Sequence, residues 1–90
     1  MTVGLSMYFV YFLKSERNGK IYVGSTGQEL EKRLKQHNVG ANVWTKLNKL
    51  FKLIYYEKYW CKKDAEMREK FYKIGFGREI KKLIVQNIGV

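Results

Sequence analysis

The hydrophobic and polar positions at the start of the chain predict two strands joined by a tight turn. Residues 8–13 form a continuous run of aromatic and aliphatic side chains, which is typical of a buried strand. The polar stretch 14–19 ends in Asn-Gly, a strong turn signal, and residues 20–24 return to the composition of a strand. We therefore expect an antiparallel hairpin whose second strand is broken by Ser25 to Gly27.

A helix is expected to follow the hairpin, from about residue 27 to residue 38. Thr26 and Glu29 fit a capping box, in which each side chain bonds a backbone N–H at the start of the helix. Leu30 and Leu34 are four residues apart, so they provide an apolar face towards the core.

The pattern of the second half predicts a short helix, a third strand and two more helices. Val43, Leu47 and Leu50 recur at helical spacing, and residues 52–60 are rich in aromatic and β-branched side chains. The next helix is expected to begin with Asp64 as its cap and to stop at Gly75 and Gly77, with a core stripe of Met67, Phe71 and Ile74. The apolar side of the last helix consists of Ile80, Leu83, Ile84 and Ile88.

This order of elements predicts an α/β (α+β) sandwich with a small, largely antiparallel sheet flanked by helices. The 90 residues fit a single domain over 1–90 with one modest core. No apolar run approaches the ~18 residues of a membrane span, and the start of the chain has no signal-peptide pattern. The single cysteine, Cys61, excludes an internal disulfide and a multi-cysteine zinc site, and it favours a reducing compartment such as the cytoplasm.

The distribution of charge along the chain predicts a binding partner. The chain has 18 basic and 8 acidic residues and a net charge of +10. The segment 32–56 contains basic residues and no acid. Charge of this sign and density is typical of proteins that bind polyanions, so we expect residues 32–52 to contact the phosphates of a nucleic acid. A membrane surface is less favoured, because it usually requires an amphipathic basic helix. The alternative is a solvated basic surface with no such partner.

Candidate chemistry begins with Tyr11 and Tyr22, one on each strand of the hairpin. Paired positions in an antiparallel hairpin share a constant sum, and any odd sum places these tyrosines on one face of the sheet. A turn on the Asn-Gly pair gives 37, and a loop centred on Glu16 and Arg17 gives 33. We expect the two hydroxyls to lie together, although tyrosine is also common in strands without any catalytic role.

The following helix carries Arg33 and His37 on one face, because they are four residues apart. A guanidinium binds a phosphate through two parallel hydrogen bonds, and the imidazole titrates near neutral pH. The alternative is a surface ion pair between Glu29 and Arg33, with His37 solvated at the end of the helix.

Carboxylates matter because phosphodiester hydrolysis commonly uses a hard cation such as Mg²⁺, held by carboxylate oxygen and water. The candidate ligands are Asp64, Glu66, Glu69 and Glu79. Glu69 lies nearly opposite the expected apolar stripe of its helix, beside Ala65 and Tyr72, so periodicity predicts that it is exposed to solvent. Nothing in the spacing selects it as a ligand.

Taken in order, four short motifs resemble the GIY-YIG nuclease family in its compact single-domain form. The motifs are FVY at 9–11, YVG at 22–24, Leu30-x-x-Arg33-Leu34-x-x-His37 and Ala65-x-x-Arg68-Glu69-x-x-x-Lys73. The resemblance covers residues 8 to about 87. It implies a three-stranded antiparallel sheet flanked by helices, with the site residues around one divalent cation and the scissile phosphate. Phe9-Val10 replaces Gly-Ile of the family pattern, and Val23 replaces its Ile.

The resemblance also implies roles for individual residues. The catalytic residues it implies are Tyr11, Tyr22, Arg33, His37 and Glu69, and the metal-binding residue is Glu69, which would hold one Mg²⁺ or Mn²⁺. The residues expected to contact nucleic acid are Gly24, Lys32, Lys35, Lys46, Lys49, Lys73 and Asn87. Gly24 is also expected to permit a sharp exit from the second strand.

We therefore expect a metal-dependent endonuclease that cleaves DNA, including branched or damaged DNA, in repair, recombination or mobile-element processing. A tyrosine, either Tyr11 or Tyr22, would deprotonate or orient the attacking water, and Arg33 would stabilise charge on the phosphate. A protein partner could supply specificity, since so short a chain has little surface for it. One alternative is an inactive nucleic-acid adaptor with the same fold, and a weaker one is a protein-binding domain.

Overall fold

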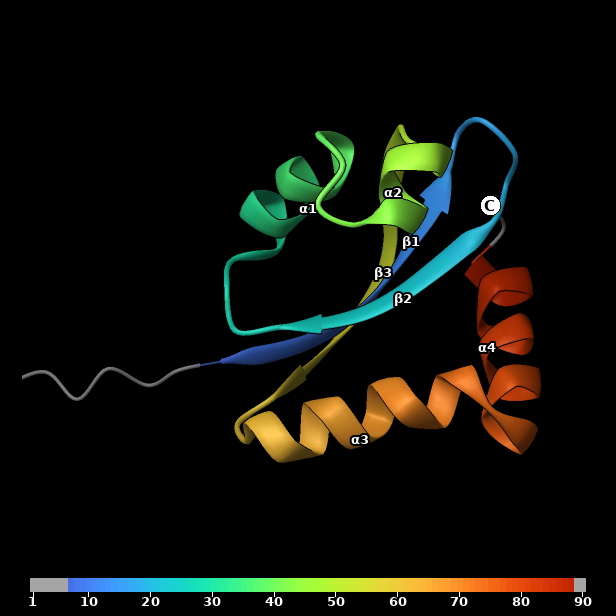
Figure 1. Ribbon diagram of the computed structural model, residues 1–90. Coiled ribbons are helices and arrows are strands. Elements are labelled where there is room, and N and C mark those ends of the chain that lie inside the picture. Colours follow the sequence, from blue (N-terminus) through green and yellow to red (C-terminus); the bar gives the residue numbers. More distant parts are fainter. Residues whose placement is uncertain (1–6, 89–90) are drawn as a thin grey trace, which may run out of the picture.

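Three strands and four helices make up residues 7–88, the part of the chain that this computed structural model describes (Figure 1). They follow one another as β1 Tyr8–Ser15, β2 Ile21–Thr26, α1 Leu30–Asn38, α2 Val43–Asn48, β3 Phe51–Tyr59, α3 Lys62–Lys73 and α4 Gly75–Ile88. The expected α+β class and the order of its elements are confirmed. The ends of the expected domain, residues 1–6 and 89–90, lie outside the described residues.

The strands form one antiparallel sheet in the order β2-β1-β3, with β2 at an edge. In the hairpin Tyr11 pairs with Gly24 and Leu13 pairs with Tyr22, so the paired numbers add up to 35. This odd sum confirms that the two tyrosines share a face, although the turn is centred on neither expected position. Gly19 ends the turn with a φ of 74°, a conformation that glycine adopts without strain.

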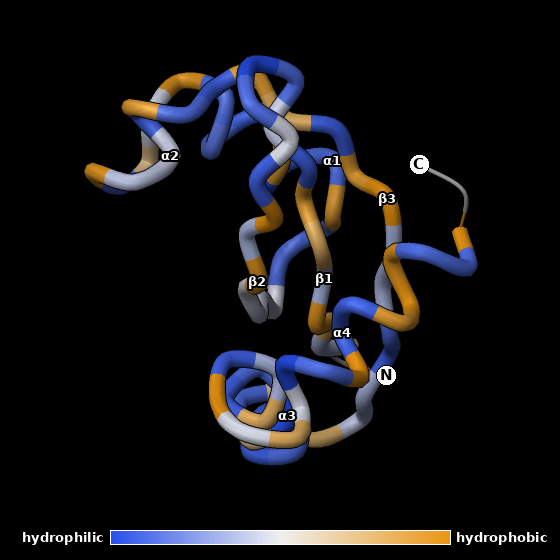
Figure 2. Tube along the Cα trace, turned by 90° about the vertical axis from the view of Figure 1, so that its right-hand side faces the viewer, coloured by the Kyte–Doolittle hydropathy of each residue, from blue (hydrophilic) through white to orange (hydrophobic). Residues whose placement is uncertain are grey.

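The side chains of β1 are buried on both faces of the sheet, as its continuous apolar run predicts. Val10 and Phe12 belong to a cluster with Tyr72 of α3, whereas Tyr11 and Leu13 belong to a second cluster under α1 and α2. Figures 1 and 2 show α1 and α2 on one face of the sheet and α3 on the opposite face. Helices from both faces can therefore supply side chains to the edge strand β2.

Helix α1 begins at Leu30, later than expected, with Glu29 at the N-cap position and no side-chain cap. The predicted capping box of Thr26 and Glu29 is therefore wrong. Thr26 remains in β2, and its hydroxyl accepts a hydrogen bond from the backbone N–H of Gln28 at 3.0 Å. The predicted break of the strand at Ser25 is also wrong, because the ladder between β1 and β2 continues through Ser25 and Thr26.

Helix α2 lies where the sequence predicts it, but its predicted apolar face does not reach the core. Val43, Leu47 and Leu50 are exposed, whereas Thr45 and Asn48 are buried. The side-chain amide of Asn48 donates to the carbonyl oxygen of the preceding turn, and a capping box at the start of the helix holds Thr45. Polar contacts thus decide which face of α2 turns inwards, and periodicity of apolar residues indicates the wrong one.

Helix α3 also turns a different face inwards from the one predicted. Met67 and Ile74 are exposed, while Ala65 and Tyr72, on the opposite side, are fully buried. Asp64 lies in the first turn and does not cap the helix. Of the predicted core stripe only Phe71 packs against the core, and the predicted cap is wrong.

A polar cluster on β3 explains the orientation of α3. Glu57 accepts hydrogen bonds from the hydroxyls of Tyr55 and Tyr59, both at 2.6 Å, and also from that of Tyr72. Arg68 of α3 donates to the same carboxylate from Nε at 3.1 Å. Burial by itself raises the pKa of Glu57, but these bonds outweigh it and hold the pKa below its usual value. The face of α3 that docks on the sheet is therefore the one with matching polar groups.

Helix α4 follows directly, and its predicted apolar side is only partly correct. Ile80 and Ile84 pack against the core, whereas Leu83 and Ile88 are exposed. Gly77 lies inside this helix instead of ending the previous one. A Cβ at position 77 would overlap the backbone of α3, so the close contact between the two helices requires glycine there. Among residues 7–88, none of the helices combines the length and the apolar character needed to cross a bilayer.

Candidate active site at the edge of strand β2

Tyr11 and Tyr22 lie next to each other above the edge strand β2, with ring centroids 6.4 Å apart. The phenol of Tyr11 extends across the backbone of Gly24, its partner in the ladder. A Cβ at Gly24 would overlap the Tyr11 hydroxyl, so only glycine leaves the phenol room to reach the edge of the sheet. Gly24 therefore lies within the strand, and the predicted role as the exit from β2 is wrong.

The hydroxyl of Tyr11 contacts two residues of α1. It lies 2.7 Å from Nε2 of His37 and accepts a hydrogen bond from Nε of Arg33 at 3.3 Å. Nη1 of Arg33 also donates to the side chain of Gln36 at 2.7 Å. Arg33 thus points to the same side as the tyrosines, as expected. The alternative of a surface pair between Glu29 and Arg33 with a solvated histidine is wrong, since His37 is fully buried.

The environment of Tyr11 keeps its hydroxyl protonated at neutral pH. Burial raises the pKa of Tyr11 to about 12, and the Tyr22 phenol and the Glu69 carboxylate act in the same direction. Arg33 opposes this rise through its hydrogen bond and its charge. The charge of Glu69 therefore acts on Tyr11, although the Tyr11 side chain lies on the face under α1 and α2 and Glu69 belongs to α3 on the opposite face.

The environment of His37 keeps its imidazole neutral. Burial, together with the neighbouring charge of Arg33, lowers the pKa of His37 to about 4. A neutral imidazole has one N–H and one acceptor nitrogen. Nε2 of His37 shares its hydrogen bond with the Tyr11 hydroxyl, and the direction of that bond depends on the tautomer of the ring. Nδ1 has no hydrogen-bond partner within residues 7–88.

Tyr22 lies between the buried histidine and the outer part of the site. Its ring is 4.7 Å from the ring of His37 and 5.3 Å from that of Trp44 of α2, measured between centroids. Its hydroxyl accepts a hydrogen bond from the side-chain amide of Asn42 at 3.3 Å. Since Tyr22 is only half-buried, its hydroxyl is the more accessible of the two.

Glu69 reaches the same strand from α3, on the other face of the sheet. Its Oε1 accepts a hydrogen bond from Ser25 Oγ at 2.5 Å, and its Oε2 pairs with Lys73 Nζ at 2.6 Å. The Lys73 ammonium also lies 6.0 Å from the ring centroid of Tyr22. The side chain of Glu69 is 23% exposed, so the prediction from periodicity that it faces solvent is wrong. The reason is that α3 packs on the sheet with the face opposite to the one predicted.

The carboxylate of Glu69 suits a divalent cation that keeps several of its waters. Magnesium is commonly held by one or two carboxylates plus water and substrate phosphate. Lys73 already contacts this carboxylate, so its position stabilises positive charge. Within residues 7–88 no group of three or more histidine, cysteine and acidic residues gathers anywhere. Of the other candidates, Asp64 is exposed at the start of α3, and Glu79 pairs with Lys82 on α4. Glu66 lines a neighbouring pocket together with Ser25.

The residues expected to contact nucleic acid are distributed unevenly around this site. The exposed lysines on α1 and around α2 are Lys32, Lys35, Lys46 and Lys49. Lys73 lies in the site itself, through its pair with Glu69. Asn87 is exposed near the end of α4, and no hydrogen bond within the described residues joins it to the site. The structure therefore brings Lys73 to the candidate site and leaves Asn87 without a contact there.

Sequence reasoning missed several residues near Tyr22. A groove beside it is lined by Trp44 of α2 and, from α3 and α4, by Lys73, Arg78 and Lys81. Burial and the charges of the neighbouring cations lower the pKa of Lys81. The three-residue spacing of Arg78 and Lys81 on a helix was a signal for a shared face, but nothing local indicated that this face would meet β2.

Comparisons with known proteins identify a matching family and two similar proteins. The sequence profile of the GIY-YIG catalytic domain matches residues 7–82. The chain is 38% identical over 68 residues to a UPF0213 protein of Clostridium perfringens, which covers 74% of this chain and 71% of that protein. The fold of this chain is similar to the solution NMR structure of a UPF0213 protein from Bacillus halodurans, with a TM-score of 0.55 and 25% identity. The match covers 92% of this chain and 87% of the other.

Proposed function

Because this chain belongs to the GIY-YIG family, whose catalytic domain implies nuclease-type activity, we propose that it is a metal-dependent endonuclease that hydrolyses phosphodiester bonds in DNA. The observation that carries the proposal is the meeting of Tyr11, Tyr22 and Arg33 with Glu69 at one edge of the sheet. Two phenols, a guanidinium and a carboxylate thus come together from four different elements, β1, β2, α1 and α3.

Arg33 is suited to bind the scissile phosphate. A guanidinium has five N–H donors, and here Nε is used by Tyr11 and Nη1 by Gln36. The remaining donors can stabilise the charge that grows on the phosphate oxygens as the water attacks. The bond to Tyr11 fixes the orientation of the guanidinium before substrate arrives, so little ordering remains for the reaction itself.

The two tyrosines are assigned different tasks. The hydroxyl of Tyr11 is committed to His37 and Arg33, and its raised pKa disfavours loss of its proton. Tyr22 is the better candidate to contact the attacking water and orient it towards phosphorus, because its hydroxyl is more accessible. A cation bound at Glu69 would supply Lewis acidity towards the phosphate and the leaving oxygen.

The surrounding surface supports a polyanionic substrate. Exposed lysines of α1 and α2 lie on the side of the sheet that carries the tyrosines, and they would contact backbone phosphates. We propose that the DNA is branched or damaged, that the activity serves repair, recombination or mobile-element processing, and that a protein partner adds specificity. The single cysteine, Cys61, is a free and exposed thiol, which fits a cytoplasmic location.

One observation favours a second candidate function, an inactive nucleic-acid adaptor. Both oxygens of Glu69 already have partners, Ser25 and Lys73, so a cation must share or displace them. In the adaptor the ion pair would be permanent, and the basic surface would bind without cleavage.

Incubation of the purified chain with labelled linear, nicked and branched duplexes, in Mg²⁺, Mn²⁺ or EDTA, separates these functions. The nuclease proposal predicts cleavage products with either metal and none in EDTA. Binding without cleavage of any substrate in either metal would contradict it and support the adaptor. Absence of both binding and cleavage would contradict both.

A further inference from the structure

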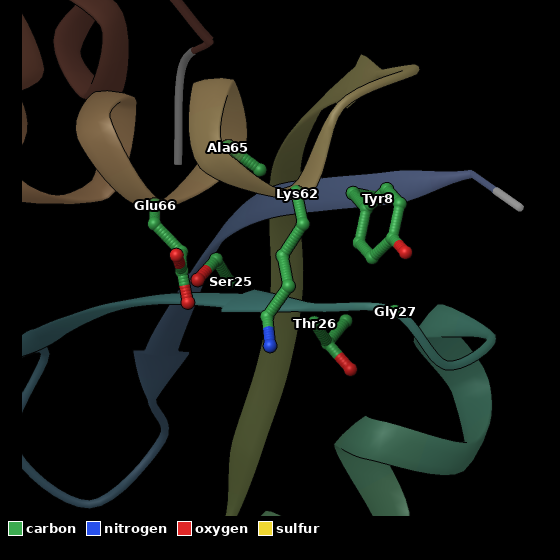
Figure 3. A pocket seen from close by; sticks show the side chains of 7 residues that line it. All are labelled: Tyr8, Ser25, Thr26, Gly27, Lys62, Ala65 and Glu66. Atoms are coloured by element: carbon green, nitrogen blue, oxygen red, sulfur yellow. The ribbon is translucent and has the colours of Figure 1, made fainter.

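A small polar pocket lies beside Glu69, between the end of β2 and the first turns of α3 (Figure 3). Its lining residues are Tyr8, Ser25, Thr26, Gly27, Lys62, Ala65 and Glu66. Its volume is about 180 Å³. Pockets for drug-sized ligands are larger, about 300–1,000 Å³, so this one suits a single ring system and not a whole nucleotide.

Two opposite charges of α3 reach into the pocket without pairing. Figure 3 shows the side chains of Lys62 and Glu66 extending from α3 towards the end of β2. They are one helical turn apart, a spacing at which such charges commonly form an ion pair. Within residues 7–88, however, neither side chain makes a hydrogen bond or an ion pair. A hydrogen-bond donor and a charged acceptor are thus presented side by side.

The opposite wall of the pocket offers an aromatic ring and a hydroxyl group. The ring of Tyr8 lies against Gly27, where a Cβ would be 3.1 Å from a ring carbon. Ser25 contributes its hydroxyl from the end of β2, whereas the hydroxyl of Thr26 points away from α3. Aromatic side chains provide surfaces on which nucleic-acid bases stack. The pocket therefore combines a stacking surface with donors and acceptors around its edge.

Ser25 connects this pocket to the candidate active site. Its hydroxyl lines the pocket and donates to Oε1 of Glu69 at 2.5 Å. A strand whose scissile phosphate lies at Glu69 would therefore carry a neighbouring nucleotide to the mouth of the pocket. A base that enters must leave the stack, as in other enzymes that bind an extruded base.

We infer that this pocket binds one guanine base adjacent to the scissile phosphate, an inference that rests on the proposed function. Along one edge guanine has the carbonyl O6 beside the N1–H and N2–H donors. The carboxylate of Glu66 would accept both N–H groups, and the ammonium of Lys62 would donate to O6. Thymine has a carbonyl on either side of its single N–H, so a carboxylate would face carbonyl oxygen. Adenine and cytosine offer the carboxylate only an amino group.

The test titrates the full ¹⁵N-labelled chain with each of the four deoxynucleoside 5′-monophosphates in EDTA and follows backbone amide shifts. Deoxyguanosine monophosphate should shift the amides of residues 25–27 and 62–66, and it should bind about tenfold more tightly than thymidine monophosphate. Equal affinities for the four nucleotides, or shifts confined to other residues, would overturn the inference.

Two variants test the assignment of Lys62 and Glu66. Glu66→Gln and Lys62→Ala should each reduce the guanine preference to less than about twofold. The matched control is Glu79→Gln, the same change at an exposed glutamate of α4, and it should leave the preference intact. A guanine preference that survives Glu66→Gln and Lys62→Ala would contradict the assignment.

Cleavage with Mg²⁺ of oligonucleotides that differ only in the bases around the cut site separates this inference from the proposed function. Guanine preference in the titration without cleavage would support the pocket and contradict the nuclease. Cleavage that is indifferent to the neighbouring base, with equal monophosphate affinities, would support the nuclease and contradict the pocket.

Discussion

Replacing Tyr11 with phenylalanine removes the hydroxyl through which the sheet contacts α1. The change deletes the 2.7 Å contact with Nε2 of His37 and the acceptor of Arg33 Nε. Because His37 is fully buried, its Nε2 would be left without a partner. A buried polar group without a hydrogen bond costs about 1–3 kcal/mol. We expect Tyr11→Phe to lower the free energy of unfolding by that amount.

Urea denaturation followed by circular dichroism measures this loss. The midpoint should fall while the m-value stays unchanged, since the fold itself is retained. Tyr56→Phe is the matched control, because Tyr56 is exposed on β3 and its hydroxyl makes no hydrogen bond within residues 7–88. Its unfolding free energy should change by less than about 0.5 kcal/mol.

A double variant isolates the bond between Tyr11 and His37. Tyr11→Phe combined with His37→Phe removes both polar partners, so no unpaired nitrogen remains in the core. The double variant should therefore lose less stability than the sum of the single variants, by about 0.5–3 kcal/mol. Additive losses, or a Tyr11→Phe loss no larger than that of Tyr56→Phe, would refute the reasoning.

Three further predictions follow from the same geometry. The pKa of His37 falls from its usual 6.5 to about 4 in the folded chain, so the unfolded state binds more protons between these values. The contribution of His37 to the free energy of unfolding should be fully present above pH 6.5 and should decline by about 3 kcal/mol as the pH falls to 4. Chemical denaturation at several pH values measures this dependence, which should be missing in His37→Gln. Lys46→Ala and Lys49→Ala should weaken binding to all duplex sequences alike. In a plot of log affinity against log salt concentration, measured by fluorescence anisotropy, the slope should fall by about 0.9 per lost phosphate contact, and an unchanged slope would exclude those contacts. Gly24→Ala should displace the Tyr11 phenol and lower kcat, and an unaffected kcat in a cleavage assay would contradict the need for glycine there.

The part of the fold that depends on local signals could be predicted from the sequence. The apolar run of β1 and the Asn-Gly pair indicated the hairpin. Both expected turn positions gave an odd sum, which placed Tyr11 and Tyr22 on one face before the register was known. The spacing of Arg33 and His37 correctly indicated a shared helical face. These features involve neighbours within a strand, a turn or a helix.

The orientation of α3 could not be predicted in this way. It depends on Tyr72 and Arg68 bonding to Glu57 of β3, groups brought together by the tertiary fold. A periodicity argument counts apolar side chains and assigns no weight to such bonds, so it placed Glu69 in solvent. The resemblance to the family selected Glu69, but its contact with Ser25 appears only in the folded chain.

The burial of His37 could not be predicted from the sequence either. A lone histidine at the end of a helix is usually solvated, and nothing nearby in the sequence indicates that Tyr11, Tyr22 and Phe51 surround it. Its neutral state follows from that enclosure and from the charge of Arg33.

The most direct test of the central claim is metal-dependent DNA cleavage by Glu69→Gln compared with the unchanged chain. Glutamine keeps the shape of the side chain and removes the negative charge that a hard cation requires. The account predicts that cleavage in Mg²⁺ falls at least about a hundredfold, while circular dichroism and DNA affinity are retained. Glu79→Gln, the same change outside the site, should cleave normally. Cleavage by Glu69→Gln at the rate of the unchanged chain would contradict the account.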